Sequence, residues 1–166
     1  MSFAVGSRVV LPVFGLGHIA GLVAKSFSGA QEQQYYEVTV QQSTVWVLTS
    51  TAAGRGMRSV TPKAQLDRYR RVLRSRPAPL TADHRQRQME LANRLKIGLF
   101  QDTCEIVRDL SARGWTKPLN ETDSSALRKA REGLHQEWAA ADGVPVAQAA
   151  EEVNALLLAS KKAFQA

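Results

Sequence analysis

The sequence has little cysteine and no long apolar run, which argues against a disulfide-bonded protein and against a membrane-spanning one. Only one of its 166 residues is cysteine, which excludes an internal disulfide and predicts a reducing, cytoplasmic location. No apolar run approaches the roughly 20 residues that a membrane-spanning helix needs. The first residues, MSFAVGSR, lack the layout of a signal peptide, and we expect no membrane partner. The hydrophobic fraction of 44% is nevertheless enough to form the core of one domain or of two small ones.

Residues that could carry out catalysis are equally scarce. His18, His84 and His135 are far apart in the sequence, and none has a second metal ligand at a typical spacing. Cys104 falls on the apolar stripe of an expected helix, which favours a buried structural thiol over a nucleophile. The chain also lacks a phosphate-binding loop and a Gly-x-Ser-x-Gly nucleophile elbow. We therefore expect no enzyme, no metal or other cofactor and no small-molecule substrate.

The first 60 residues have the composition of short β-strands, because runs rich in Val, Tyr, Thr and Trp alternate with Gly and Ser. The predicted strands are Arg8–Phe14, His18–Lys25, Gln34–Gln41 and Thr44–Thr49. Four or five short strands in so few residues are typical of a small barrel of the SH3 or Tudor type. Pro12 cannot donate a ladder hydrogen bond, which predicts an edge or a barrel bend. Gly15 and Gly17 would supply the backbone freedom of the turn that follows.

Alternation along these strands predicts which side chains point inward. In QYYEVTV, Tyr36, Val38 and Val40 are expected to share one face, and Tyr35, Glu37 and Thr39 the other. Trp46 has two interpretations. It could be a core aromatic, or it could point outward, because its neighbours Val45 and Val47 suit the inward face better.

After Val60 the pattern changes to helical periodicity. Thr61-Pro62 combines an N-cap hydroxyl with a proline at the first helical position. The predicted helices run from Thr61 to a break at 75–79, from Thr81 to about Lys96, from Leu99 to Ala112, from Asn120 or Thr122 to the DGVP segment, and from Val146 to Lys162. The predicted fold class is therefore α+β, with a β-barrel domain at 1–60 and an all-helical bundle of about five helices at 61–166.

The spacing of apolar residues also assigns faces to these helices. In the second helix Met89, Ala92 and Leu95 are expected inward, while Arg85, Arg87 and Arg94 are expected largely outward. Gly98 is expected to interrupt that helix and Gly114 to end the third. The expected core residues of the third and fourth helices are Phe100, Cys104, Val107, Leu110, Leu127, Ala130, Leu134 and Trp138.

The net charge of +7 is concentrated in one stretch. Positions 68–96 carry 9 Lys/Arg against 2 Asp/Glu, whereas positions 1–67 carry 5 against 3 and positions 97–166 carry 8 against 10. A basic block of this kind attracts polyanions, most often the phosphates of nucleic acids. It is equally typical of a solvated helix face, and charge alone does not separate the two interpretations.

The segment FAVGSRVVLPVFGLGHIAGL resembles the opening of the CarD/CdnL family of bacterial transcription regulators. Members begin with Val-Gly-Asp-x-Val-Val-Tyr-Pro-x-x-Gly-x-Gly, and the residues that fit are Val5, Gly6, Val9, Val10, Pro12, Gly15 and Gly17. Ser7 and Leu11 replace the usual Asp and Tyr. QYYEVTV, GMRSV, IVRDL and LRKAREGL extend the similarity over nearly the whole chain in the right order. The same barrel opens the transcription-repair coupling factor, where a helicase motor follows that 166 residues could not contain.

The resemblance implies a regulator of transcription initiation. The barrel of such proteins docks on the RNA polymerase β subunit, largely by a strand-to-strand contact, and position by position this implicates Lys25, Phe27, Trp46 and Leu48. The helical domain meets promoter DNA at the upstream edge of the bubble and stabilises the open complex. The corresponding candidates are His84, Arg85, Arg87, Arg94 and Lys96, contacting mainly phosphates without sequence specificity. A nucleoid-associated location in the cytoplasm would follow.

Two further segments depart from the family pattern. A tryptophan in an Asn-Trp-x-x-Arg context usually begins the second helix, and here Asp83-His84 stands at that place. An imidazole can stack on a base or donate a hydrogen bond, but it is a smaller apolar wedge than an indole. VLTSTA replaces the usual Val-Pro-x-Glu-Asn segment. The alternative function is a protein–protein adaptor without direct DNA contact, in which the basic stretch is solvated.

Overall fold

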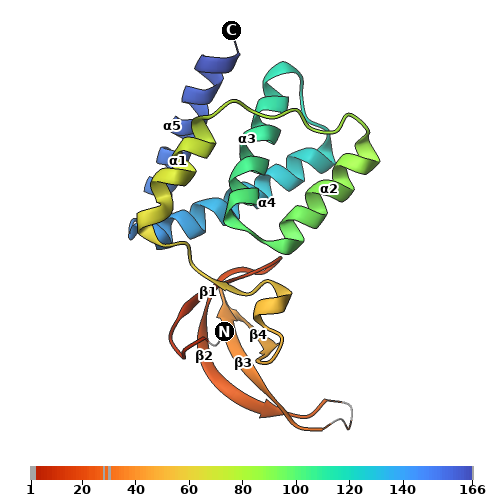
Figure 1. Cartoon of the computed structure of the whole chain (residues 1–166), viewed down its shortest axis with the longest axis vertical. Helices are drawn as coiled ribbons and strands as arrows, with labels where there is room; N and C mark the ends of the chain where they lie inside the picture. The colour runs from red at the N-terminus through yellow and green to blue at the C-terminus, as the bar shows by residue number, and fades with distance from the viewer. Residues whose placement is uncertain (1–2, 28, 30, 166) are drawn as a thin grey trace. The chain divides into compact units, whose positions relative to one another are not determined.

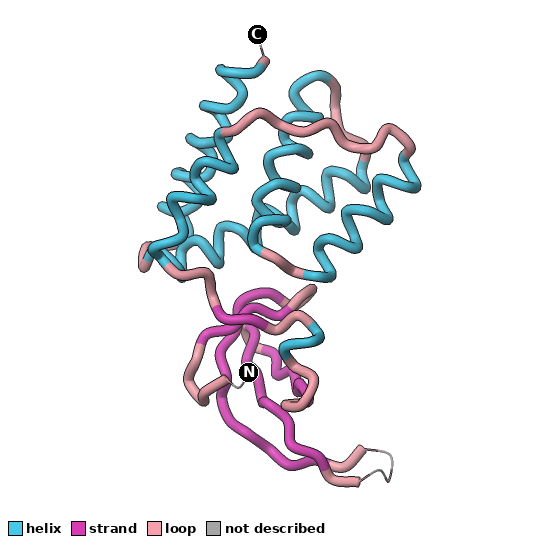
Figure 2. Tube along the Cα trace, viewed as in Figure 1, coloured by secondary structure: helices cyan, strands magenta, loops and turns pink. Residues whose placement is uncertain are grey.

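The computed structural model describes residues 3–27, 29 and 31–165. The chain divides into two compact units, Met1–Val60 and Thr61–Ala166 (Figure 1). Strands occur in the first unit and the long helices in the second (Figure 2). This arrangement confirms the predicted α+β fold class. No helix among the described residues is long and apolar enough to cross a membrane.

The first unit is a five-stranded antiparallel sheet with strand order β4-β3-β2-β1-β5. Its strands are β1 (Arg8–Leu11), β2 (Gly15–Lys25), β3 (Gln33–Val40), β4 (Ser43–Leu48) and β5 (Arg58–Ser59). Among the described residues, β4 and β5 are the two edges, so the sheet is open, whereas a small barrel of the SH3 or Tudor type was expected. The reason is that β5 has only two residues, and these pair with β1 alone. A short 3₁₀ turn at Ala53–Arg55 connects β4 to β5.

The turn between β1 and β2 differs in detail from the prediction. β1 ends at Leu11, so Pro12 lies in the turn and is not a strand residue. Gly15 has a φ of 93°, which only glycine adopts easily. Gly17, in contrast, lies within β2 opposite Val9, and a Cβ there would approach the Thr39 carbonyl oxygen to 2.6 Å. Gly17 is therefore needed for close approach between strands, and its assignment to the turn was wrong.

The inner face of the sheet is apolar, as the alternation predicted. Tyr36, Val38 and Val40 are all buried, and they pack with Val9, Leu11, Ile19, Ala52 and Met57. The Tyr36 hydroxyl accepts a hydrogen bond from the Phe3 amide at 3.0 Å, which satisfies its polar end. One face of the sheet thus forms a small core and leaves the opposite face exposed.

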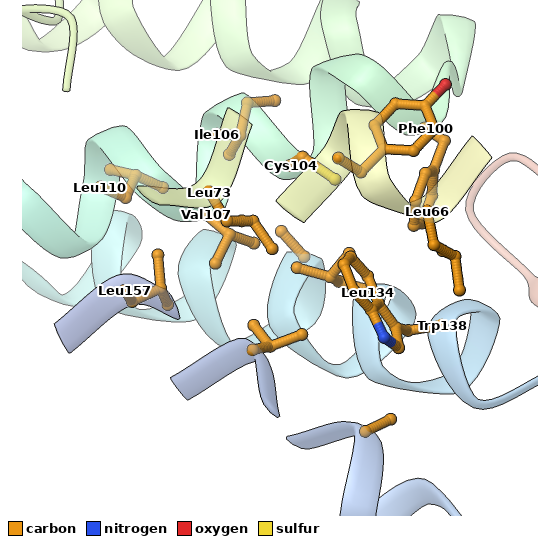
Figure 3. Close-up of a cluster of buried hydrophobic side chains, with 14 of the residues drawn as sticks. Leu66, Leu73, Phe100, Cys104, Ile106, Val107, Leu110, Leu134, Trp138 and Leu157 are labelled. Carbon is orange, nitrogen blue, oxygen red and sulfur yellow. The ribbon is translucent and has the colours of Figure 1, made fainter. Parts of the chain in front are cut away.

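The second unit consists of α1 (Leu66–Arg74), α2 (His84–Ile97), α3 (Phe100–Thr116), α4 (Glu121–Asp142) and α5 (Val146–Phe164). Its core contains Leu66, Leu73, Phe100, Cys104, Val107, Leu110, Leu134 and Trp138 (Figure 3). Each such side chain contributes about 1.5–3 kcal/mol on burial. The predicted core residues of α3 are all buried, and Cys104 is inaccessible among them.

A polar network links three helices at the base of this core. The Trp138 indole on α4 donates to Glu152 on α5 at 2.9 Å, and the Arg70 guanidinium on α1 lies 2.8 Å from the same carboxylate. The hydrogen bond from Arg70, followed by that from Trp138, holds the pKa of Glu152 below its ordinary value. The same carboxylate raises the pKa of Arg70 above its ordinary value. A buried indole N–H and two charges are thus satisfied together.

The helix boundaries predicted at Thr61 and Gly114 were wrong. Thr61 does not cap a helix, because its amide and hydroxyl both donate to the buried Glu137 carboxylate, at 3.0 and 2.7 Å. A 3₁₀ turn at Lys63–Gln65 follows before α1 begins. Gly114 does not end α3, which continues to Thr116, because the glycine is accommodated in helical conformation next to Leu119. Gly98, with a φ of 80°, does end α2 as expected.

Candidate functional site

The exposed face of the sheet brings the four predicted docking residues together. Trp46 on β4 points outward and is 42% exposed, while Val45 and Val47 pack toward the core. The interpretation of Trp46 as a core aromatic was therefore wrong. The Lys25 ammonium from β2 lies 3.8 Å from the centroid of the Trp46 ring, a cation–π contact that orders both side chains.

The rest of this face is built around Tyr35. Its ring meets Phe27 edge-on, with centroids 5.4 Å apart, and Leu48 pairs with it across the β3–β4 ladder. The alternation of β3 already placed Tyr35 outward, but no sequence motif marked it as a site residue. We refer to Lys25, Phe27, Tyr35, Trp46 and Leu48 as the outer sheet face.

The outer sheet face adjoins a sheet edge. In the described part of the chain β4 pairs only with β3, so one row of its backbone N–H and C=O groups has no partner strand. Such an edge is a template for strand addition unless it is blunted. Trp46 and Leu48 lie on this strand, so a strand added there would meet main-chain groups and an aromatic side chain at once.

The second candidate site begins at the N-terminus of α2. Asp83 caps this helix by accepting a hydrogen bond from the Gln86 amide at 2.9 Å. The predicted cap, Thr81, instead donates its hydroxyl to Glu90. His84 is the first residue of the helix and is exposed. The position that the resemblance singled out therefore lies at an accessible helix start.

The His84 ring is held by side chains from two helices. Its Nδ1 lies 3.1 Å from the Asn120 side-chain nitrogen and 3.3 Å from an Arg87 nitrogen, and its Nε2 lies 2.9 Å from the Gln88 amide. The Asn120 oxygen caps α4 by accepting from the Asp123 amide, so the Asn120 nitrogen faces the ring. Nδ1 therefore accepts from two donors, and the ring is presented in one fixed orientation.

Arg87 is buried, and its predicted outward orientation was wrong. Its side chain is 2% exposed and lies 3.0 Å from the equally buried carboxylate of Asp123 on α4. Another of its nitrogens donates to the carbonyl oxygens of Thr81 and Ala82, and Arg113 approaches Asp123 at 3.6 Å. Arg87 thus connects the segment before α2, the His84 ring and α4, and it is unable to reach DNA phosphates.

The remaining cations of α2 divide into two groups. Arg94 is half-buried and bonded to two α3 carboxylates, Asp102 and Glu105, each at 3.0 Å, so its outward assignment was also wrong. Arg85 is exposed, as predicted, and so is Lys96. Of the residues expected inward, Leu95 packs against the core, but Met89 is 58% exposed and Ala92 is exposed, and Leu91 is buried instead. The accessible α2 candidates are therefore His84, Arg85 and Lys96.

A shallow groove runs along α4 beside these elements. It has a volume of about 510 Å³ and is lined by Ser124, Leu127, Arg128, Arg131, Glu132 and His135. Partial burial, with Arg131 nearby, lowers the pKa of His135. Among the described residues no group of His, Cys, Asp or Glu is arranged to hold a metal ion.

Two comparisons with known proteins show the family to which this chain belongs. Residues 69–154 match the family described as CarD, C-terminal domain, which is more than half of the chain. The chain belongs to the CarD family. Over 144 residues it is also 28% identical to the "Putative transcription factor YdeB" of Bacillus subtilis (strain 168), covering 86% of this chain and 94% of that protein. The protein is thus a transcription factor of the CarD type, as its sequence predicted.

The CarD match covers most of the helical unit. It extends from Tyr69 in α1 to Asn154 in α5 and includes the His84–Arg87–Asp123 network. The outer sheet face lies before the matched range, within the longer similarity to the Bacillus protein.

Proposed function

We propose that this CarD family member docks on the β subunit of bacterial RNA polymerase through the outer sheet face and the adjoining β4 edge. The observation that carries the proposal is the exposed Trp46 ring with Lys25 stacked on it, on the edge strand β4, which pairs only with β3 among the described residues. An aromatic anchor supplies most of the energy of a typical interface. Strand addition supplies main-chain hydrogen bonds, and alternate side chains supply specificity.

The helical unit, in this proposal, contacts promoter DNA near the upstream edge of the transcription bubble and stabilises the open complex. Support comes from the exposed and immobilised His84 ring, which can stack on an unpaired base step. Arg85 and Lys96 are available for phosphates, and such contacts position the protein without reading sequence. Arg87 positions His84 and does not itself contact DNA. Association with the nucleoid would follow.

One observation favours the alternative of an adaptor without DNA contact. Arg87 and Arg94 are paired with carboxylates inside the helical unit, so part of the basic stretch serves the protein's own packing. Titration of the full chain with fork-junction DNA at several salt concentrations separates the two functions. Phosphate contacts predict an affinity that falls steeply with salt, and no binding at low salt would favour the adaptor.

Docking is tested by Trp46→Ala in the full chain, with Phe14→Ala as the matched control. Phe14 is also an exposed aromatic of the first unit, but it lies outside the outer sheet face. We expect Trp46→Ala to weaken binding to purified β subunit by about 30-fold, or roughly 2 kcal/mol. The control should bind almost as tightly as the unsubstituted protein. Equal affinities for the two variants would contradict the proposed surface.

The role of His84 is tested by the lifetime of preformed open complexes after a heparin challenge. His84→Trp should lengthen this lifetime, because a larger ring covers more of the exposed base step. Asn120→Ser keeps an N-cap side chain for α4 but removes a donor to His84, and we expect it to shorten the lifetime. His18→Ala changes another exposed histidine and serves as the control. If His84→Trp and His84→Ala both leave the lifetime unchanged, the wedge role is absent.

A further inference from the structure

In the folded protein, only some of the cations at positions 68–96 remain free to bind an anionic partner. Of the nine cations at 68–96, three are paired with carboxylates in the helical unit: Arg70, Arg87 and Arg94. Arg68, Arg71 and Arg74 on α1 are exposed, and within the described ranges none of them has an ion pair. The largest group of available charge therefore lies on α1, where the basic block was predicted to attract phosphates but no individual residue was named as a DNA contact.

These three arginines share one face of the helix. At about 100° per residue, steps of three residues place them within an arc of about 120° and along about 9 Å of axis. The opposite side of α1 carries Leu66, Tyr69 and Leu73, which are buried in the core. Asp67 is exposed on the same side of the helix as the three arginines, and its carboxylate is engaged by Arg70 at 2.7 Å. The three arginines outnumber this one carboxylate, so the face stays positive.

Helix stability does not explain this charge. Cations near a helix C-terminus interact favourably with the macrodipole, and this accounts for Arg71 and Arg74 in the last turn. Arg68 lies in the first turn, where the dipole opposes a cation. Like charges three or four residues apart also repel one another. The Arg68 guanidinium lies 5.7 Å from the centroid of the Tyr69 ring, a contact that offsets part of this repulsion, and an anionic partner would remove the rest.

We propose that Arg68, Arg71 and Arg74 form a second phosphate-binding surface, which contacts the backbone of fully paired DNA. All five cations between 68 and 76 are arginines, and the planar guanidinium binds phosphate oxygens in a bidentate manner that lysine lacks. Figure 1 shows α1 beside α5, with α2 on the far side of α3 and α4, so this surface is distinct from the start of α2. The inference rests on the proposed DNA contact of the helical unit and extends it to duplex DNA.

The test measures binding of the full chain to a random-sequence duplex over a range of salt concentrations. The variant Arg68→Gln/Arg71→Gln/Arg74→Gln removes the surface, and Lys117→Gln/Lys129→Gln/Lys162→Gln removes the same charge from other exposed positions. We expect the first variant to reduce the slope of log affinity against log salt by about two to three units, since each phosphate contact contributes about 0.9. The control should reduce it by less than about one unit. Replacing the three arginines with lysine should keep the slope and weaken binding.

The outcomes separate this inference from the proposed function. If the unsubstituted protein binds neither duplex nor fork-junction DNA at low salt, the proposed DNA contact fails, and the inference fails with it. If it binds DNA and both glutamine variants lose the same slope, only the α1 surface is overturned. If the α1 variant keeps its DNA affinity and instead loses binding to polyglutamate, the surface recognises an acidic protein and the inference is again overturned. Thermal unfolding followed by circular dichroism verifies that each variant is folded.

Discussion

The outer sheet face and helix α2 present their expected functional side chains very differently. On the sheet, Trp46 is exposed and in contact with Lys25, as its position in the strand predicted. On α2, Arg87 is buried against Asp123, and Arg94 is bonded to two carboxylates of α3. The same kind of reasoning therefore succeeded in one region and failed in the other.

The difference comes from how each element encodes orientation. A strand has only two faces, so identifying one inward residue such as Val47 fixes its neighbour Trp46. A helix has a continuous range of orientations, and its phase is defined only when apolar residues gather on one side. On α2 they do not, because Met89, Leu91 and Ile97 lie on different sides and only Leu91 is buried.

Substitution of the buried Arg87 should lower the free energy of unfolding more than any other change considered. Arg87→Ala leaves the Asp123 carboxylate buried without its main partner, which typically costs about 3–5 kcal/mol. Arg85→Ala, two residues earlier on the exposed face, should change the free energy of unfolding by less than about 0.5 kcal/mol. Urea denaturation of both variants measures the difference. Similar stabilities for the two would mean that Arg87 is as accessible as Arg85, and the contrast with the sheet would disappear.

Substitution of one glycine in the sheet and one in a helix should change the stability of the protein by an intermediate amount and in opposite directions. Gly17→Ala forces a methyl group against the backbone of β3, and overpacking of this kind typically costs about 1–3 kcal/mol. Gly133→Ala in α4 meets nothing within 4 Å and should stabilise the protein by about 0.5–1 kcal/mol, because alanine is the better helix former. Thermal unfolding should therefore shift in opposite directions. A lower melting temperature for Gly133→Ala would contradict the open environment of that position.

The smallest expected effect concerns the titration of His135. Burial, with Arg131 nearby, lowers its pKa in the folded protein below the ordinary 6.5. The unfolded chain therefore binds more protons than the folded one in this range, so stability falls as the pH drops below about 6.5. His135→Gln should remove this part of the pH dependence. Denaturation curves at pH 7.5 and at pH 5 for both proteins measure it, and parallel losses of stability would exclude a contribution from His135.

Local sequence signals predicted most of the fold for identifiable reasons. Tyr36, Val38 and Val40 alternate as required for one buried face, and all three are buried. Asn120 was one of two candidate caps for α4, and its side chain does accept the Asp123 amide. Gly98 ends α2 with a positive φ. In each case the physical cause acts within a few residues of chain.

The predictions for Thr61, Gly17 and Arg87 failed because the deciding partner lies far away along the chain. Thr61 satisfies every local criterion for an N-cap, but its hydroxyl bonds to Glu137, 76 residues away. Gly17 fits a turn locally, but β3 packs against it. The partner of Arg87 lies 36 residues along the chain. A local signal cannot reveal a competing partner that only the folded chain brings near.

The sequence by itself determined which regions form strands and which form helices, and it favoured an outward Trp46, because periodicity and turn chemistry are local. It also fixed how much positive charge residues 68–96 carry. Only the tertiary structure decided which of those cations remain available. The carboxylates of Asp102, Glu105 and Asp123 come from α3 and α4, and packing brings them to Arg94 and Arg87. The sequence therefore sets the number of charges in this stretch, and packing against α3 and α4 sets which of them remain accessible, because the partner carboxylates belong to other helices.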